Sequence, residues 1–453
     1  MFRLPRPARW LLPFVLVGST GCATYADRLV AVRQHFAAGS LAEAEAELEK
    51  GLRRRPDRDC IKLDRAILQL ASGKPKEAEQ TLRVIRDRFD HLEQPAIAEK
   101  ALSALTDANH ESYAGEDYEK VLTRVFLSLS NLMTDGGDAG AYALQVADKQ
   151  QQIIDAGVDK NGENPKLTYK RVAVGPYLQG AIREETHANY DDVARSRAMV
   201  CSWQPDFPFG AQDLERARYG RHSAPGNGVF YVFALVGLGP YKEEAVEAPT
   251  TISLLVADRI LSATGKHTLP PTIAPVKVPK VVLTPSSVQA IQVVVNGSPA
   301  GRTATISDIG RMAVEQYEAI YPRVIAEAVV RRVVKKAVVV GAKEATGTDR
   351  YSLASVGFDV AGIAWEATES ADTRCWGLLP DKIQVLRIEL PAGQHRVSLQ
   401  SAGPTGHALG RAAMQTVTIE NGRNTYVLAN FPGTDLVGSM LTNRPSGPTG
   451  LTR

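Results

Sequence analysis

The apolar and polar positions in the first part of the chain repeat with a spacing of 34 residues. In residues 36–56 and again in 70–90, a glycine separates two stretches of helical periodicity, and an alanine follows that glycine after five positions. The equivalent positions are Gly39 with Gly73 and Ala44 with Ala78. Glycine permits a tight turn between antiparallel helices, and the small alanine lets the two helices approach closely. The pattern therefore predicts two similar helix pairs.

A helix pair that recurs every 34 residues is typical of the tetratricopeptide repeat (TPR). Two weaker units follow over residues 118–154 and 177–205, and ordinary paired amphipathic helices would explain these two as well. We predict that residues 22–222 form a TPR-like helical domain. Stacked pairs of this kind build an α-solenoid, whose concave surface is suited to binding a peptide.

Short runs of β-branched residues begin after residue 222. Runs at residues 229–236, 250–256, 281–283 and 290–295 predict strands. Helical periodicity returns at about residues 307–340, which we interpret as a helical insertion. We expect this helix to break at Pro322, because proline lacks a backbone donor and clashes with the preceding turn.

Two pairs of alternating segments near the C-terminus predict β-hairpins. Their turns are Pro391-Ala392-Gly393, between residues 383–390 and 394–400, and Asn421-Gly422, between residues 416–420 and 425–429. We assign residues 223–440 to a β-rich, sandwich-like domain and residues 441–453 to a flexible tail. The predicted fold class is thus α+β, with an N-terminal TPR-like α-solenoid followed by a β-rich domain that carries a helical insertion.

The N-terminal residues have the pattern of an export signal. Arg3, Arg6 and Arg9 precede an apolar run at residues 10–18, and small residues then lead into Cys22. About nine apolar residues are too few to span a bilayer, which needs roughly 20 in a helix. We predict that residues 1–21 are a lipoprotein signal peptide and that Cys22 is lipidated. An ordinary cleavable signal is the alternative.

Charge and cysteine content exclude several classes of protein. The chain has 53 Lys and Arg against 50 Asp and Glu, a net charge of +3. Since the leader's three arginines equal this excess, the mature chain is near neutral, which argues against nucleic-acid binding. After Cys22, the cysteines Cys60, Cys201 and Cys375 form at most one disulfide, and their spacing excludes a C-x-x-C metal or redox site. We expect buried free thiols.

The sequence contains no catalytic or metal-binding motif that we can identify. Its eight histidines lack metal-ligand spacing, and neither a nucleophile elbow nor a Walker A loop occurs. We therefore predict no catalytic residues, no metal and no cofactor. An enzyme acting on cell-wall or surface polymer, with its site in the β-rich domain, remains the alternative, because pairs of catalytic carboxylates are recognised by distance and not by sequence.

Three further segments carry a resemblance to a known family. They are Gly226-Asn227-Gly228-Val229, Gly239-Pro240-Tyr241-Lys242 and the more specific motif Ala371-Asp372-Thr373-Arg374-Cys375-Trp376-Gly377-Leu378-Leu379-Pro380. Together with the lipobox-like Cys22 and the TPR-like helices, they resemble a family of TPR-containing bacterial lipoproteins whose biochemical function is undefined. The resemblance implies a lipid-anchored protein of the bacterial cell envelope. Ala23, in place of the aspartate that favours inner-membrane retention, favours the outer membrane, facing the periplasm.

Asp372, Arg374 and Trp376 are the candidate structural residues of that motif. We expect Arg374 to hold a carboxylate in a bidentate pair and Trp376 to bury a large apolar surface. A carboxylate, a guanidinium and an indole close in sequence would also suit binding of a polar ligand, which is the alternative.

The sequence thus predicts a non-catalytic interaction scaffold. We expect an envelope protein or peptide to bind the concave TPR face, lipid at Cys22 to hold the protein on a membrane, and no nucleic acid to bind. Some TPR helices only brace a neighbouring domain, and this possibility stays open.

Overall fold

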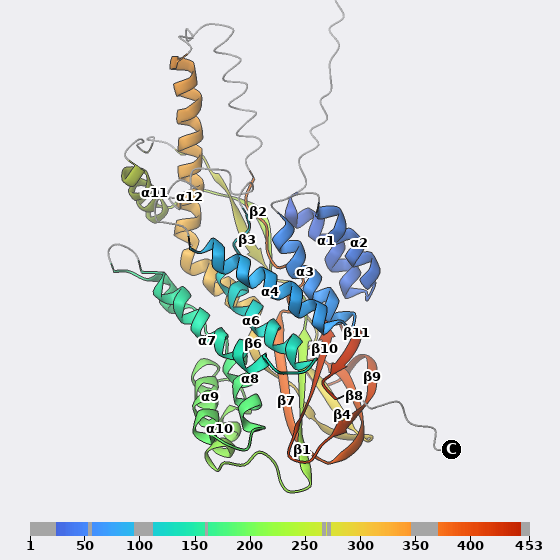
Figure 1. Ribbon diagram of the computed structural model, residues 1–453. Coiled ribbons are helices and arrows are strands. Elements are labelled where there is room, and N and C mark those ends of the chain that lie inside the picture. The colour runs from blue at the N-terminus through green and yellow to red at the C-terminus, as the bar shows by residue number, and fades with distance from the viewer. Residues whose placement is uncertain are drawn as a thin grey trace, which may run out of the picture.

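The computed structural model describes residues 24–52, 57–94, 112–158, 162–264, 269, 273–345 and 370–444. The predicted signal segment and Cys22 lie outside these residues. The protein has a mixed α+β fold, in which N-terminal helices precede C-terminal β-sheets (Figure 1).

The N-terminal helices form antiparallel pairs joined by short turns. Thr24 caps the first helix, because its hydroxyl accepts from the Asp27 N–H while the Asp27 carboxylate accepts from the Thr24 N–H. The pairs are α1 (Tyr25–Ala37) with α2 (Leu41–Gly51), α3 (Arg58–Ala71) with α4 (Pro75–Leu92), α6 (Asp117–Leu132) with α7 (Ala139–Asp155), and α8 (Val174–Glu184) with α9 (Tyr190–Trp203). The short 3₁₀ helix η3 (Pro165–Thr168) precedes α8, and α10 (Gly210–Arg218) follows α9.

The four predicted repeat positions lie at the turns and contacts of the first two pairs. Gly39 and Gly73 both have a φ of +79°, a conformation that costs glycine little. Ala44 and Ala78 are fully buried. The two turns therefore share one backbone geometry, and the helices of each pair approach closely at the alanines.

The strands form three sheets. They are β1 (Asn227–Val236), β2 (Tyr241–Glu247), β3 (Val276–Val282), β4 (Ala290–Val295), β5 (Ser298–Arg302), β6 (Ala304–Asp308), β7 (Lys382–Pro391), β8 (Gly393–Ala402), β9 (Ala408–Ile419), β10 (Asn424–Phe431) and β11 (Val437–Thr442). One sheet has the order β11-β10-β1-β7-β6, a second has the order β5-β4-β8-β9, and β2 pairs with β3. The β1–β10 pairing is parallel and aligns Val229 with Asn424, whereas the other pairings are antiparallel.

Neither predicted hairpin forms. β7 belongs to the five-stranded sheet and β8 to the four-stranded sheet, and β9 and β10 are divided in the same way. The turns at Ala392 and Gly422 instead bind the start of β1 and the residue before it, through N–H donors to the carbonyls of Gly226 and Asn227 at 2.9 and 2.8 Å. An alternating segment fits a hairpin and a crossing between stacked sheets equally well, so the pattern could not separate them.

Two segments adopt a different structure from the one predicted. Residues 250–256, predicted as a strand, lie mostly in helix α11 (Thr251–Thr264), because the Thr250 hydroxyl accepts from the Ser253 N–H at 3.2 Å and Ser253, Ala257 and Leu261 line its buried face. The helical insertion, α12 (Ile309–Ala345), runs through Pro322 without ending. β11 also reaches Thr442, two residues into the segment predicted as a tail.

The five-stranded sheet lies between two other layers (Figure 1). On β1, Tyr231 and Phe233 belong to the core shared with the N-terminal helices. Val232 and Ala234 belong to the core shared with the four-stranded sheet. The order of layers is helices, five-stranded sheet, four-stranded sheet, and the first core continues across the predicted boundary at residue 222.

A separate arm projects from these layers (Figure 1). It consists of α11, α12 and the β2–β3 pair, which share a small core that includes Ala257, Val278 and Val329. Among the helices of the described residues, none is both long and apolar enough to cross a membrane.

Candidate peptide groove on the inner face of the helices

The motif segment lies against the helices that lead each of the first three pairs. We call residues 371–379 the strap, and we call the side of α1, α3, α6 and α8 that faces the strap and the five-stranded sheet the inner face. Residues 371–376 of this segment have no helix or strand, and residues 377–378 form a turn. Thr373, Cys375, Trp376 and Leu378 are each at most 2% exposed. The strap is thus an irregular segment enclosed by the rest of the chain.

The inner face binds the backbone of the strap. Glu119 on α6 accepts from the Trp376 N–H at 2.7 Å, and Asp64 on α3 accepts from the Leu378 N–H at 2.8 Å. Arg33 on α1 donates to the Gly377 carbonyl, which lies between those two donors in sequence. Side chains of three helices therefore bind three consecutive residues of the strap through its main-chain groups.

The segment around β2 closes the other side of the strap. Glu244 accepts from the Ala371 N–H at 2.8 Å, and the Gly239 N–H donates to the Leu379 carbonyl at 2.6 Å. Both ends of the strap are therefore held by the start of the arm.

Trp376 anchors the strap in the core. Its side chain is fully buried and its ring lies 5.3 Å from that of Phe126 on α6. Its Nε1 donor has no partner among the described residues. Gly377 follows it at a close approach, since a Cβ there would lie 2.3 Å from a Leu29 methyl. The Trp-Gly-Leu sequence therefore fits a deep pocket followed by a contact that admits no side chain.

Asp372 and Arg374 form the bidentate pair expected for a fixed turn. Arg374 donates from Nε and Nη2 to the two Asp372 oxygens at 2.8 and 2.7 Å, and its guanidinium lies over the Tyr113 ring. Burial would raise the pKa of Asp372, but the hydrogen bond and charge of Arg374 outweigh it and lower that pKa. All three motif residues are engaged inside the protein.

Asp64 and Glu119 are buried carboxylates without an ion pair. Each is fully buried, and no Lys, Arg or His nitrogen of the described residues lies within 4.0 Å of either. Asp64 also accepts from the Tyr25 hydroxyl at 3.0 Å, and Glu119 also accepts from the Tyr113 hydroxyl at 2.5 Å, the Glu116 N–H at 3.1 Å and the Tyr118 hydroxyl at 3.4 Å. Burial raises the pKa of both carboxyl groups to about 7.

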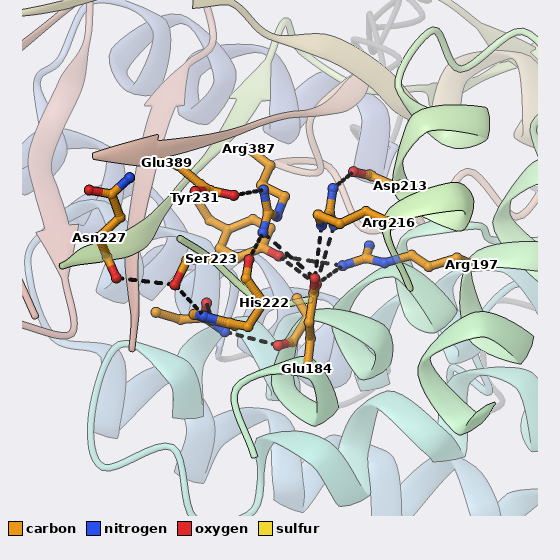
Figure 2. Close-up of polar contacts among 12 residues, drawn as sticks. Glu184, Arg197, Asp213, Arg216, His222, Ser223, Asn227, Tyr231, Arg387 and Glu389 are labelled. Carbon is orange, nitrogen blue, oxygen red and sulfur yellow. Dashed lines mark hydrogen bonds and ion pairs between the residues drawn. The ribbon is translucent and has the colours of Figure 1, made fainter. Parts of the chain in front are cut away.

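A second buried cluster joins the later helices to the sheet (Figure 2). Glu184 at the end of α8 is fully buried and binds Arg216 of α10 at 2.9 Å and Arg197 of α9 at 3.2 Å, with Arg387 of β7 at 3.6 Å. Burial alone would raise the pKa of Glu184, but Arg197, the hydrogen bond from Arg216 and then Arg387 lower it to about 2. One carboxylate thus ties three helices to a strand.

Beside this cluster lies a chain of polar contacts centred on a histidine (Figure 2). His222 Nδ1 lies 3.0 Å from the Ser223 hydroxyl, and its Nε2 lies 2.9 Å from Asn424 Oδ1. Because Asn424 Oδ1 can only accept, Nε2 donates to it, and the Ser223 hydroxyl donates to the Asn227 carbonyl at 3.1 Å. Burial lowers the pKa of His222, which is 2% exposed. A histidine beside a serine could polarise the serine hydroxyl, but here the His222 side chain lies inside the protein.

Two surface pockets contain neither the strap nor His222. One, of about 440 Å³, is lined by the α6–α7 turn, the end of α8 and the start of β10, with Arg423 and Arg444 each within 3.7 Å of Glu185. The other, of about 610 Å³, is an apolar notch between α9 and α10 that includes Cys201. Cys60, Cys201 and Cys375 are free thiols, and burial raises the pKa of each.

Sequence reasoning identified the strap residues but not the residues that bind them. Asp64, Glu119 and Arg33 lie in different helix pairs, and Glu184 and its arginines come from three helices and a distant strand. No local spacing marks such sets. A buried-face carboxylate such as Asp64, between Leu63 and Ala66 of an apolar helix face, is the one weak signal that the sequence offers.

The comparisons with known proteins identify one region. The tetratricopeptide repeat family matches residues 35–105, which include α2, α3 and α4. No curated protein and no solved structure matches the chain. The match agrees with the 34-residue spacing and the two equivalent turns, and the chain therefore contains tetratricopeptide repeats within residues 35–105.

Proposed function

We propose that this protein is a non-catalytic scaffold of the bacterial cell envelope, which binds another envelope protein or peptide through its TPR-like helices. The family match supports protein binding as the role of these helices. The observation that carries the proposal is this match, which covers α2, α3 and α4. Glu119, Arg33 and Asp64 hold residues 376–378 through main-chain groups, and that segment belongs to the chain itself.

Because the strap occupies the inner face, which is the concave side of the helix pairs, we place the proposed partner on another surface. The strap and the five-stranded sheet already cover the inner face, and the second helix of each pair lies on the outside. On the outer helices α4 and α7, Val84 and Leu144 are apolar side chains that are 54% and 41% exposed. The two helices are bridged by Arg83 and Asp138 at 2.7 Å. The outer surface of α4 and α7 is therefore the favoured docking surface.

Lipidation at Cys22 would place the start of α1 near a membrane. Since α1 begins at Tyr25, only about three residues separate the lipid from folded structure. At 3.3–3.6 Å per residue such a tether spans roughly 10 Å. A partner near the same membrane, with the outer membrane as the favoured one, fits this short tether.

The buried state of the polar clusters favours a non-catalytic role. A catalytic Ser223 would need His222 to exchange protons with a substrate, yet His222 is 2% exposed and hydrogen-bonded on both nitrogens. The negative charge of Glu184 is balanced by ion pairs with arginines, which connect the helices to the sheet. Both arrangements suit a structural role.

Capture from detergent-solubilised envelopes tests the proposal. The wild-type protein is compared with a Val84→Glu, Leu144→Glu variant and with Met414→Glu, a matched control on β9 where Met414 is 60% exposed. We expect quantitative mass spectrometry to find at least one envelope protein that co-purifies with wild type and the control but is depleted with the outer-helix variant. Identical recovery with all three proteins would contradict binding through α4 and α7.

A further inference from the structure

The strap is attached by two carboxylates whose charge nothing nearby fully balances. Asp64 accepts from the strap N–H of Leu378 and from the Tyr25 hydroxyl, whereas Glu119 accepts from the strap N–H of Trp376, the Glu116 N–H and two tyrosine hydroxyls. These donors carry no full positive charge, and the negative charge of Glu116 raises the pKa of the Glu119 carboxyl further. Arg33 donates its hydrogen bonds to the carbonyls of Gly377 and Gly239 and to the Thr284 hydroxyl. Lys242 is paired with Glu116. Each of these buried carboxyl groups is therefore more stable in its neutral, protonated form than as a carboxylate without an ion pair.

Several elements bring charged or titratable groups close to the two carboxylates. The titratable and charged groups that face them are Tyr25 and Arg33 of α1, Cys60 of α3, Tyr113, Glu116 and Tyr118 at and before the start of α6, Lys242 of β2, and Asp372, Arg374 and Cys375 of the strap. Arg374 is paired with Asp372. The set therefore contains no positive charge that forms an ion pair with Asp64 or Glu119.

We infer that the strap is a pH-sensitive latch, held on the inner face while Asp64 and Glu119 are protonated and loosened when both ionise. This inference concerns the chain alone and does not depend on the proposed partner. Release of the strap would withdraw Trp376 from its pocket beside Phe126. It would expose the parts of α1, α3 and α6 that now bind the Trp376-Gly377-Leu378 backbone.

The direction of the effect follows from burial. Burial raises the pKa of both carboxyl groups to about 7, whereas in a released, hydrated state they would titrate near 4. The docked strap is therefore favoured most strongly below about pH 4, and this advantage is lost as the pH rises through 7. Two buried carboxylates that ionise together also repel each other, which acts in the same direction.

Hydrogen exchange of the full chain, followed by mass spectrometry, tests the latch. After correction for the intrinsic pH dependence of amide exchange, we expect protection of the strap amides to fall about tenfold or more between pH 5.5 and pH 8.5. Asp64→Asn with Glu119→Gln should remove this dependence, because neither amide ionises between the two pH values. Glu79→Gln, at a buried carboxylate on α4, is the control and should behave as wild type.

Equal strap protection at the two pH values in wild type would overturn the latch, and so would a pH dependence that persists in the double variant. If the double variant does not fold, each single variant should remove part of the dependence, and the wild-type comparison needs no variant. None of these readouts involves a partner, so failure of the latch is distinguishable from failure of the proposed scaffold function.

Discussion

Replacement of Trp376 by alanine should destabilise the whole protein. The side chain is fully buried in the core shared with the N-terminal helices, and it packs against Phe126. Removing a buried tryptophan costs about 3–5 kcal/mol, because the lost burial and the cavity left behind add together. Relaxation of the strap would lower this cost, since residues 370–376 form no helix or strand that would hold the cavity open. We therefore expect about 3 kcal/mol.

Two matched variants separate burial from other effects. Trp376→Phe keeps an aromatic ring and removes a buried Nε1 donor that has no partner among the described residues, so its cost should be clearly smaller. Trp203→Ala removes a half-buried indole on α9, which contacts Arg171, and should also cost less. Urea unfolding of the mature soluble chain, monitored by circular dichroism, measures all three. A wild-type midpoint for Trp376→Ala, with loss of partner binding instead, would refute the structural role and make the motif a binding site.

The remaining predictions concern the second buried cluster and the anchor. Glu184→Gln should lower the free energy of unfolding by about 3 kcal/mol, because Arg197, Arg216 and Arg387 then surround a neutral amide. Folding lowers the Glu184 pKa from 4.5 to about 2, so the stabilisation that Glu184 supplies is complete above about pH 4.5 and is lost as the pH falls toward 2. Identical acid unfolding of wild type and Glu184→Gln would contradict this. Cys22→Ser should release the protein from membranes or leave it unprocessed, since two acyl chains suffice for stable attachment; identical soluble fractionation of both proteins, with no lipid mass, would exclude the anchor.

The features that sequence predicted well are those set by neighbouring residues. The TPR spacing depends on a glycine with a left-handed backbone and an alanine five residues later, and both recur at Gly39 and Gly73 in the same geometry. The family match to residues 35–105 supports the same interpretation. Local turn chemistry and helical periodicity were therefore sufficient for these pairs.

Contacts between distant residues were not predictable in this way. β10 is buried along its whole length because one of its faces packs against the helices and the other against the four-stranded sheet. Nothing near Asn421-Gly422 specifies β1 as its parallel neighbour. The strand predicted at residues 250–256 is a helix in the structure, because the Thr250 hydroxyl caps the N-terminus of α11 and outweighs the β-branched side chains that follow. The motif residue Trp376 was identified, but its partner Glu119 is 257 positions away in the chain.

Photo-crosslinking in cells tests the central claim most directly. A benzophenone amino acid is placed at Val84 on α4, at Leu144 on α7, and at Met414 on β9 as the control, since all three side chains are exposed. The account predicts an adduct with a specific envelope protein from Val84 or Leu144 and none of that adduct from Met414. Adducts that form from Met414 alone would contradict the account, because the sheets and not the TPR-like helices would then contact the partner.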